Sequence, residues 1–435
     1  MLKAENKGKF YLALVIFSLV GQVAWVVENM YLNVFIYKMF HASASDISLM
    51  VAASAIAATV TTLLIGALSD KIGKRKLFIC GGYILWGISI WGFALIRTEW
   101  IRVVFDPMIP AMASAAELGV VMVILLDCLM TFFGSSANDA CFNAWLTDST
   151  DASNRGSVEG INAMMPLVAI LVVFGGFMGF DQDLPQTWTV IFGIIGSVVL
   201  LLGIAGFFLI EEPKVQTQGN EHYFANLLYG FRPGVIRSNA KLYLTLLAYA
   251  VFGISIQIFM PYLILYYTVS LGMENYVLIF APAIIVAAAF TAFYGKVYDR
   301  KGFGFSVIPA LVLLMAGYVV LYFFRHSVPV FLGTLIMLCG YLAGMAVFGA
   351  MLRDHTPENK AGMFQGQRII GQVLIPGIIG PAIGAAVLQN AETIINDDGT
   401  TSFIPNENIF LAAFLAAVLI FVVLIPLLKK EDKHG

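Results

Sequence analysis

The chain of 435 residues is 60% hydrophobic and only 12% charged, whereas a soluble domain is roughly 45–50% apolar and about 25% charged. This apolar excess excludes a water-soluble globular protein, and a net charge of -2 gives no support for a nucleic-acid partner. An aromatic content of 13% excludes a disordered chain. The composition therefore predicts a protein whose surroundings are the lipid bilayer.

Twelve apolar stretches are each long enough to cross a bilayer as a helix, which takes about 20 residues. Because lipid offers the backbone no hydrogen-bond partners, only helices or closed barrels span it, and stretches this long are not barrel strands. They fall near residues 11–39, 46–69, 77–96, 116–145, 159–180, 187–210, 241–269, 274–294, 305–324, 329–352, 364–389 and 408–428. We therefore predict an all-α membrane protein with twelve transmembrane helices. The first stretch is too long for a cleaved signal peptide and is expected to remain as the first span.

One long hydrophilic connection separates these helices into two sets of six. It covers residues 211–240 and begins with two glutamates and a proline. We predict an N-terminal six-helix bundle at 1–210, a cytoplasmic linker at 211–240 and a C-terminal six-helix bundle at 241–435.

Basic residues gather on one side of the predicted membrane. If the N-terminus is inside, 21 of the 25 Lys and Arg residues fall on inner segments and 4 fall on outer ones. An excess of Lys and Arg in cytoplasmic loops is the usual bias of membrane proteins. We therefore predict a multi-pass protein of the cell (plasma) membrane, with both termini in the cytoplasm, and we expect it to be a monomer.

A motif that follows the second span recurs after the eighth. Segments 66–73 (GALSDKIG) and 295–302 (GKVYDRKG) share the spacing Gly-x-x-x-Asp-basic-x-Gly, 229 positions apart. A second pair, Asp148-x-Thr and Asp354-x-Thr, is offset by 206 positions. Two separate repeats indicate that the two bundles are pseudo-symmetric copies of one unit.

Segment 66–75 resembles the signature of the major facilitator superfamily, and the chain resembles that superfamily over essentially its whole length. The resemblance implies the major facilitator fold, in which two six-helix bundles give alternating access to a solute site near the middle of the membrane. Residues 28–31 and 148–160 resemble the glycoside-pentoside-hexuronide:cation symporter branch, which contains the melibiose carriers. Those carriers hold their cation with two carboxylates of helix two, and the matching positions here are Ala58 and Thr62. We therefore expect protons, rather than sodium, to be the coupling ion.

Helix one carries a group of polar residues that are candidates for solute binding. An ionisable residue within a span costs at least ~2.5–3.5 kcal/mol on insertion scales, so Glu28 is a functional candidate. Asn29 and Asn33 lie on one helical face, and Trp25 precedes Glu28 by about one turn. An aromatic face beside a carboxylate suits a sugar ring, which stacks and also donates hydrogen bonds. We expect these four residues to line the solute cavity; the alternative is that the amides bond neighbouring helices.

Helix four carries Asp127 and Thr131, and both are expected to face the cavity. Asp127 is predicted to lie near the middle of the membrane and to bind solute or a proton. Asp139 is turned away and lies closer to the cytoplasm, so it is assigned to a structural network or a proton relay. Since burial disfavours the charged form of a carboxyl group, Glu28, Asp127 and Asp139 are the candidates for proton coupling.

The second half offers uncharged and basic candidates. Gln257 on helix seven and Gln372 on helix eleven are predicted to bind solute hydroxyl groups. Arg368, one turn inside the cytoplasmic start of helix eleven, has two possible roles: it faces the solute, or it belongs to an ion pair of the inner gate.

The inner loops predict a gate. Asp70 and Asp299 follow spans two and eight, and each can accept hydrogen bonds from a helix N-terminus of the opposite half. The resemblance to the superfamily implies that Asp70 faces the start of helix eleven near 362–365 and Asp299 the start of helix five near 156–159. The further gate candidates come from the repeated motifs and are Gly66, Arg75, Asp148, Arg155, Glu159 and Arg300.

These features together predict a secondary active transporter. We expect proton-coupled symport of a small polar solute by alternating access, with a glycoside or sugar as the leading solute class. The alternatives are proton-coupled efflux of amphipathic drugs, and a non-transporting sensor or lipid-handling protein. No phosphate-binding loop and no Ser/His/Asp or Cys/His arrangement is present in the sequence, so we expect no enzymatic activity, no cofactor and no metal.

Overall fold

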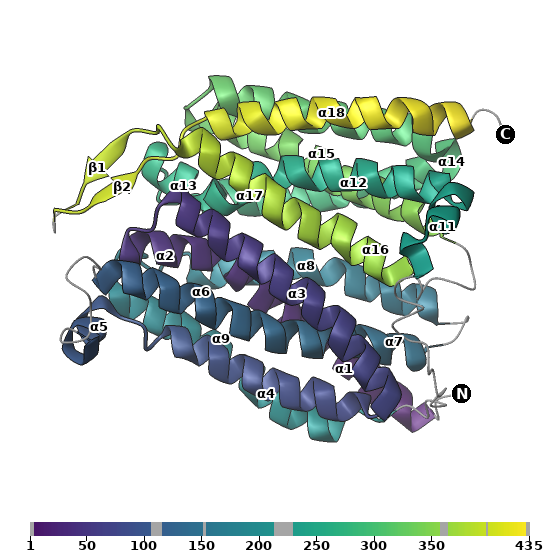
Figure 1. Ribbon diagram of the computed structural model, residues 1–435, viewed down its shortest axis with the longest axis horizontal. Helices are drawn as coiled ribbons and strands as arrows, with labels where there is room; N and C mark the ends of the chain where they lie inside the picture. The colour runs from purple at the N-terminus through teal and green to yellow at the C-terminus, as the bar shows by residue number, and fades with distance from the viewer. Residues whose placement is uncertain are drawn as a thin grey trace. The chain divides into compact units, whose positions relative to one another are not determined.

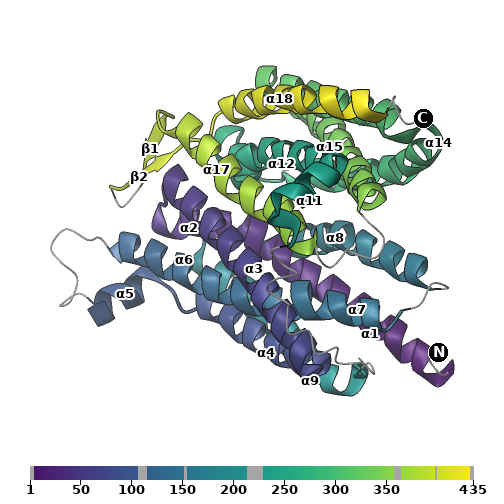
Figure 2. The same cartoon turned by 45° about the vertical axis from the view of Figure 1, so that its right-hand side comes forward.

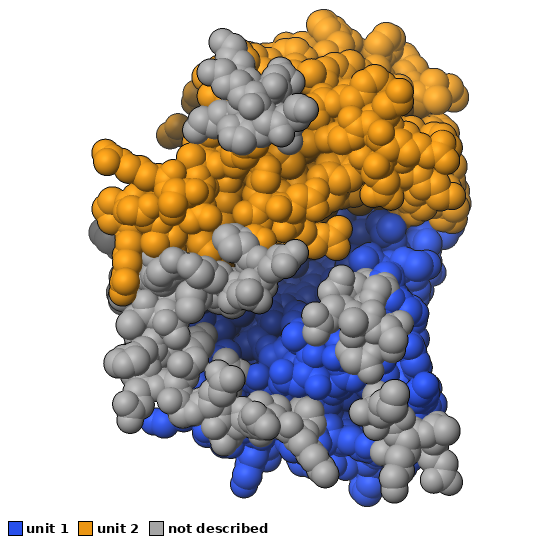
Figure 3. All heavy atoms as spheres, turned by 90° about the vertical axis from the view of Figure 1, so that its right-hand side faces the viewer, with its two compact units in different colours: residues 1–46, 53–221 blue, residues 47–52, 222–435 orange. Residues whose placement is uncertain are grey.

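The computed structural model describes residues 4–105, 115–150, 154–212, 229–356, 364–396 and 399–431. Over these residues the protein is almost entirely helical. The chain divides into two compact units, which are coloured separately in Figure 3. Unit 1 consists of residues 1–46 and 53–221, and unit 2 consists of residues 47–52 and 222–435.

Unit 1 is a helical bundle with the short helix α5 (Thr98–Phe105) at one end (Figure 1). Its helices are α1 (Ala4–Val26), α2 (Leu32–Phe40), α3 (Ala44–Ile72), α4 (Arg75–Phe93), α5 (Thr98–Phe105), α6 (Ala115–Gly134), α7 (Asn143–Asp148), α8 (Arg155–Phe177) and α9 (Pro185–Leu209). Helix α4 packs against α6 and α9, and α1 packs against α8 and α9. Aromatic side chains fill the core, where Trp188 contacts Phe35 and Phe192.

Unit 2 is a second helical bundle, to which a short hairpin is attached. Its elements are a 3-10 turn (Tyr229–Phe231), α11 (Pro233–Ser238), α12 (Ala240–Phe259), a second 3-10 turn (Met260–Tyr262), α13 (Leu263–Leu265), α14 (Val277–Phe323), α15 (Ser327–His355), α16 (Gln365–Ile369), α17 (Ile375–Leu388), β1 (Thr393–Ile395), β2 (Thr401–Phe403) and α18 (Asn408–Glu431). Helix α14 packs against α15, and α12 packs against α17 and α18. The antiparallel hairpin β1–β2 projects beyond the end of α17 (Figures 1 and 2). The sequence analysis did not predict this hairpin.

The described residues contain the twelve predicted spans, although only eleven separate stretches are long and apolar enough to cross a membrane. The difference arises from α14, which is 47 residues long. At 1.5 Å per residue such a helix would extend about 70 Å, more than twice the roughly 30 Å of a hydrocarbon core. Its backbone breaks at Gly302, where φ is 75° and ψ is -178°. Spans eight and nine therefore meet at Gly302, and residues 296–301 are helical instead of forming the predicted loop.

Spans one, four, seven and eleven each contain a π-helical stretch. These stretches are Val27–Tyr31, Ser135–Phe142, Tyr266–Ser270 and Ile370–Leu374. Short π-helical turns inside α-helices are rare and occur frequently at functional sites. Three of the four stretches contain candidate site residues, namely Glu28 with Asn29, Asp139, and Gln372.

Both copies of the repeated motif end in a glycine with a positive φ, but the two turns differ. Gly73 ends α3 in the left-handed helical conformation, with φ 68° and ψ 19°. Gly302 interrupts α14 with φ 75° and ψ -178°, an extended conformation that is essentially restricted to glycine. The positive φ therefore explains why each copy of the motif ends in glycine.

Replacing Gly302 by alanine tests this requirement. We expect Gly302→Ala to lower the free energy of unfolding by about 1–3 kcal/mol, because the extended conformation with positive φ is essentially restricted to glycine. Gly295→Ala is the matched control, since Gly295 is helical and the space around it is open. It should be neutral or stabilising by up to about 1 kcal/mol. Thermal unfolding in detergent checks both variants, and equal melting temperatures would contradict the assignment.

Candidate functional site

Two hydroxyl side chains from two other helices meet the Glu28 carboxyl group in unit 1. The Ser54 hydroxyl of α3 donates to Oε1 of Glu28 at 2.6 Å, and the Thr131 hydroxyl of α6 donates to the same oxygen at 2.9 Å. The two hydroxyl oxygens lie 2.8 Å apart. Glu28 itself is only 7% exposed. We call Glu28, Ser54 and Thr131 the Glu28 cluster.

Asp127 adds a second acidic group beside this cluster. It lies one helical turn before Thr131 on α6, is 2% exposed, and is close enough to Glu28 for the two carboxylates to repel each other. Within the described part of the chain, neither carboxylate pairs with a basic side chain. Oε2 of Glu28 and Oδ1 of Asp127 also lack a hydrogen-bond partner there. Two acidic groups are thus buried together, with no counter-charge from the part of the chain that the structure describes.

A small void borders Glu28. Its volume is about 10 Å³, close to the space that a single water molecule needs. Apart from Glu28, its lining is apolar and consists of Ala24, Val27, Leu32, Ile90, Phe93, Met130 and Phe192. Such surroundings oppose a negative charge on the carboxyl group, because a buried ion without a partner is costly.

The other predicted residues of helix one make local contacts. The rings of Trp25 and Trp86 have centroids 4.9 Å apart. Asn29 is exposed and donates to the carbonyl of Trp25 at 2.8 Å, while the buried Asn33 donates to the carbonyl of Asn29 at 2.8 Å. Both amide nitrogens therefore bond their own helix. Oδ1 of Asn33 has no partner among the described residues and is available to another group.

Asp139 lies further along span four, in a π-helical stretch. Its carboxylate accepts a hydrogen bond from the Ser135 hydroxyl at 2.9 Å, and its side chain is half-buried. It is near enough to Glu28 to act on that residue electrostatically. Asp139 thus has a local hydrogen-bond partner and lies outside the Glu28 cluster.

The candidates of the second half lie within unit 2. Gln257 on α12 is half-buried and packs closely against Gly380 of α17. A Cβ atom added to Gly380 would lie only 2.4 Å from the Cβ of Gln257. Gln372 is half-buried in the π-helical stretch that α12 packs against. Arg368 is half-buried and acts electrostatically on Tyr249, and its Nε has no acceptor among the described residues.

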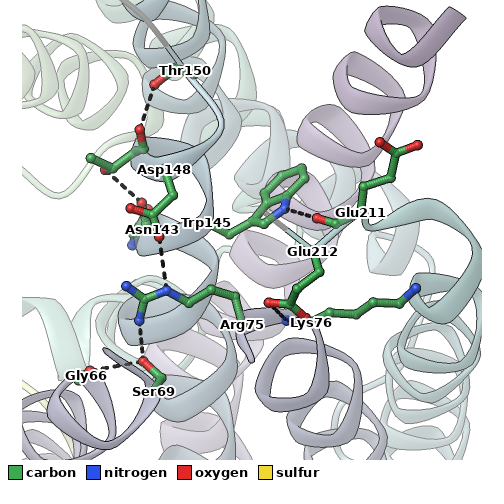
Figure 4. A network of polar contacts seen from close by, with 11 residues as sticks. Gly66, Ser69, Arg75, Lys76, Asn143, Trp145, Asp148, Thr150, Glu211 and Glu212 are labelled. Carbon is green, nitrogen blue, oxygen red and sulfur yellow. Dashed lines mark hydrogen bonds and ion pairs between the residues drawn. The ribbon is translucent and has the colours of Figure 1, made fainter. Parts of the chain in front are cut away.

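A second polar network joins the ends of three helices of unit 1, as Figure 4 shows. Arg75 at the start of α4 is 4% exposed and donates from Nε to Asp148 at 3.1 Å. Its Nη1 donates to the Ser69 hydroxyl at 2.5 Å, and that hydroxyl donates to the carbonyl of Gly66 at 3.0 Å. The Arg75 network therefore ties α3, α4 and α7 together through residues of the repeated motif.

The first residues of the predicted linker are also fixed to this end of unit 1 (Figure 4). Nε1 of Trp145 donates to the carbonyl of Glu211 at 2.9 Å, and the backbone N–H of Lys76 donates to the Glu212 carboxylate at 3.2 Å. Helix α4 receives no cap from the side chain of Lys74, which precedes it. The Glu212 carboxylate thus accepts a hydrogen bond from a backbone N–H of the first turn of α4, and its negative charge stabilises this N-terminal end of the helix.

The equivalent region of unit 2 has different polar contacts. Asp299 and Arg300 are exposed. Asp354, the counterpart of Asp148, accepts a hydrogen bond from the Tyr298 hydroxyl at 2.5 Å. Gly304 occupies the position that corresponds to Arg75, so no arginine is present there to form the ion pair.

Three of the predicted gate residues cannot be placed. The side chains of Asp70, Arg155 and Glu159 lie outside the described residues. The gate between the halves therefore remains a prediction. Of the gate candidates, the structure brings together Gly66, Arg75 and Asp148.

Ser54 is the one member of the Glu28 cluster that the sequence analysis missed. It precedes Ala58 by four residues and Thr62 by eight, so all three share one helical face. That spacing was the available signal. It could not show which of the three positions lies opposite Glu28, because this depends on how α3 packs.

The hydroxyl of Thr131 can be removed without changing the shape of the side chain. We expect Thr131→Val to lower the rate of solute uptake by roughly 2- to 10-fold, as the loss of a hydrogen bond worth about 0.5–1.5 kcal/mol implies. Thr131→Ser keeps the hydroxyl and should remain close to wild type. Initial uptake rates in proteoliposomes measure this, and identical rates in all three proteins would show that the hydroxyl has no role.

Asp148→Asn tests the Arg75 network. The change leaves a buried guanidinium without its carboxylate, and we expect the free energy of unfolding to fall by about 1–3 kcal/mol. Asp183→Asn is the control, because Asp183 forms an exposed ion pair with Lys38 that should contribute at most about 1 kcal/mol. Thermal unfolding compares the two variants. A larger loss in the control than in Asp148→Asn would argue against the network.

Comparison with known proteins places the fold. The family described as Major Facilitator Superfamily matches residues 12–381. No curated protein matches the chain in sequence. Among solved structures, the nucleoside transporter NupG is 14% identical, with a TM-score of 0.68 over 96% of this chain and 98% of that one. A D-xylose-proton symporter is also 14% identical, with a TM-score of 0.68 over 94% and 97% of the two chains.

A third solved structure is a bacterial homologue of the human lysosomal transporter Spinster. It is 16% identical and has a TM-score of 0.69 over 99% of this chain and 98% of that one. At such identities these structures show a shared fold alone. Because the family match covers more than half of the chain, the protein belongs to the major facilitator superfamily. It is a multi-pass membrane protein and a secondary transporter of a small solute, and the predicted fold is confirmed.

Proposed function

We propose that this member of the superfamily is a proton-coupled symporter whose solute is a glycoside or a related sugar. The observation that carries the proposal is the burial of Glu28 and Asp127 together in unit 1 without a basic partner among the described residues. The distribution of basic residues supports a cell membrane location with both termini in the cytoplasm.

A proton is the simplest ion for this arrangement. Two negative charges on Glu28 and Asp127 would repel each other in surroundings that screen them poorly. The pair is therefore expected to hold at least one proton while it is buried, and to release it when water enters. Movement between states that expose the pair to opposite sides of the membrane would then couple transport to a proton gradient.

Sodium is the rival ion, and the contacts of the Glu28 cluster favour it less. The Ser54 and Thr131 hydroxyls and one Glu28 oxygen are 2.6–2.9 Å apart, which are hydrogen-bond distances. These oxygens already satisfy one another. A sodium site would have to separate them, whereas a proton needs only the unpartnered carboxyl oxygens.

The side chains beside Glu28 suit a sugar. Trp25 lies one turn earlier on the same helix, and its Nε1 has no acceptor among the described residues. An indole ring offers an apolar surface to a sugar face, while its N–H and the nearby carboxylate can bond hydroxyl groups. One of the similar structures is named as a D-xylose-proton symporter, which agrees with both the solute class and the ion.

Uptake into proteoliposomes tests the proposal. A panel of labelled sugars is offered with an inward proton gradient or an inward sodium gradient. We expect accumulation with the proton gradient, no effect of replacing sodium by choline, and loss of accumulation with a protonophore. Glu28→Gln and Asp127→Asn should each abolish accumulation, because an amide cannot carry the proton. Glu117→Gln, an exposed carboxylate on the same helix as Asp127, should transport normally.

Other outcomes would replace the proposal. Several-fold stimulation by sodium without a protonophore effect would make sodium the ion. Extrusion of amphipathic compounds without sugar uptake would favour drug efflux, and binding without flux would favour a sensor. Wild-type accumulation in both carboxylate variants would show that neither group couples transport.

A further inference from the structure

A larger cavity lies at the other end of unit 1 from the Arg75 network. Its volume is about 190 Å³, and it is enclosed by the end of α2, the end of α4, the start of α5 and the start of α9. Helix α4 begins at the Arg75 network and ends at this cavity, and α5 and α7 lie at opposite ends of unit 1 in Figures 1 and 2. The cavity is therefore separate from the motif that joins α3 and α4.

One wall of the cavity is aromatic and the other carries two opposite charges. Phe35, Phe40 and Trp188 supply aromatic side chains, while Arg97 and Glu99 supply charges. Arg97 is half-buried, and one nitrogen of its guanidinium group donates to the Thr189 hydroxyl. Within the described chain, Arg97 and Glu99 form no ion pair with each other or with any other residue. Among the described residues, neither charge is neutralised by an ion pair, so a ligand can bind both.

Helix α5, which contributes Glu99, is built for the membrane surface. With 8 residues it would extend only about 12 Å, far short of a bilayer. Its side chains Trp100 and Val103 are 63% and 79% exposed, and Arg102 lies between them. Exposed tryptophan and aliphatic side chains next to arginine are typical of a helix that lies in the lipid headgroup region. This places the mouth of the cavity at the depth of lipid headgroups.

The size of the cavity sets the kind of group that it can hold. Sites for drug-sized ligands measure roughly 300–1,000 Å³, so a cavity of about 190 Å³ suits a small polar group such as a lipid headgroup rather than a drug-sized ligand. A ligand that satisfies both charges needs an anionic group for Arg97 and a hydrogen-bond-donating cation for Glu99. It also needs an apolar part that can extend along the exposed face of α5.

We propose that this cavity binds the headgroup of phosphatidylethanolamine. The phosphate bonds the guanidinium nitrogens of Arg97 that do not contact Thr189, the primary ammonium bonds Glu99, and the acyl chains lie along Trp100 and Val103. A choline headgroup has a similar charge but no N–H to donate to Glu99. A glycerol headgroup supplies no positive charge and leaves Glu99 unpaired. The site therefore distinguishes three lipids that differ only in the headgroup.

Competition among these lipids tests the proposal with the intact wild-type protein. The purified full chain is incubated with phosphatidylethanolamine, phosphatidylcholine and phosphatidylglycerol of identical acyl chains, and bound lipid is counted by native mass spectrometry. We expect phosphatidylethanolamine to be retained preferentially and to raise the melting temperature most. Equal retention of the three lipids would overturn the proposal without the need for any variant.

Variants then locate the site. Arg97→Gln and Glu99→Gln should each weaken retention of phosphatidylethanolamine by roughly tenfold, as expected for loss of one charge-assisted hydrogen bond. Arg102→Gln, on the same helix but outside the cavity lining, and Glu274→Gln, an exposed carboxylate of unit 2, are the matched controls. They should retain the wild-type preference. An equal loss in the controls would show that the lipid responds to surface charge and not to this cavity.

Discussion

The burial of the Glu28 carboxyl group in an apolar bundle is the constraint on which the organisation of unit 1 depends. Lipid cannot supply hydrogen bonds to such a group, so the protein has to provide them. Ser54 and Thr131 do so from two other helices, which fixes three spans at one point. Glu28 also lies in a π-helical stretch, a local change in the helix that is frequent where a side chain has a function.

Helix α4 connects two chemically different ends of the same unit. At its start, Arg75 bonds to Asp148, and the Glu212 carboxylate accepts from its first turn. At its end, Phe93 and Arg97 border the cavity beside α5. The point where the linker leaves unit 1 and the cavity at headgroup depth are thus joined by one continuous helix, while the apolar middle of α4 packs against α9.

The two halves share a glycine with positive φ at the end of the motif but neither the same turn nor the same polar contacts. Gly73 and Gly302 have φ values of 68° and 75°, which only glycine adopts readily, while their ψ values of 19° and -178° send the chain in different directions. The side chains differ: Asp148 pairs with Arg75, whereas its counterpart Asp354 accepts from a tyrosine hydroxyl. An arginine supplies a positive charge to its carboxylate, whereas a tyrosine hydroxyl supplies a hydrogen bond without a counter-charge, so the two repeats are chemically unequal.

The sequence alone determined the class of protein, the twelve spans and the repeat, and it singled out Glu28 and Asp127 as candidates, because hydrophobic length and the cost of a charge in lipid are local properties. It did not determine which hydroxyl meets Glu28. Ser54, Ala58 and Thr62 share one face of α3, and only the packing of α3 against helix one selects Ser54. Tertiary structure also decided two other features. The break at Gly302 appears only when spans eight and nine are seen to join without a loop. The cavity beside α5 is formed by residues that are far apart in the sequence.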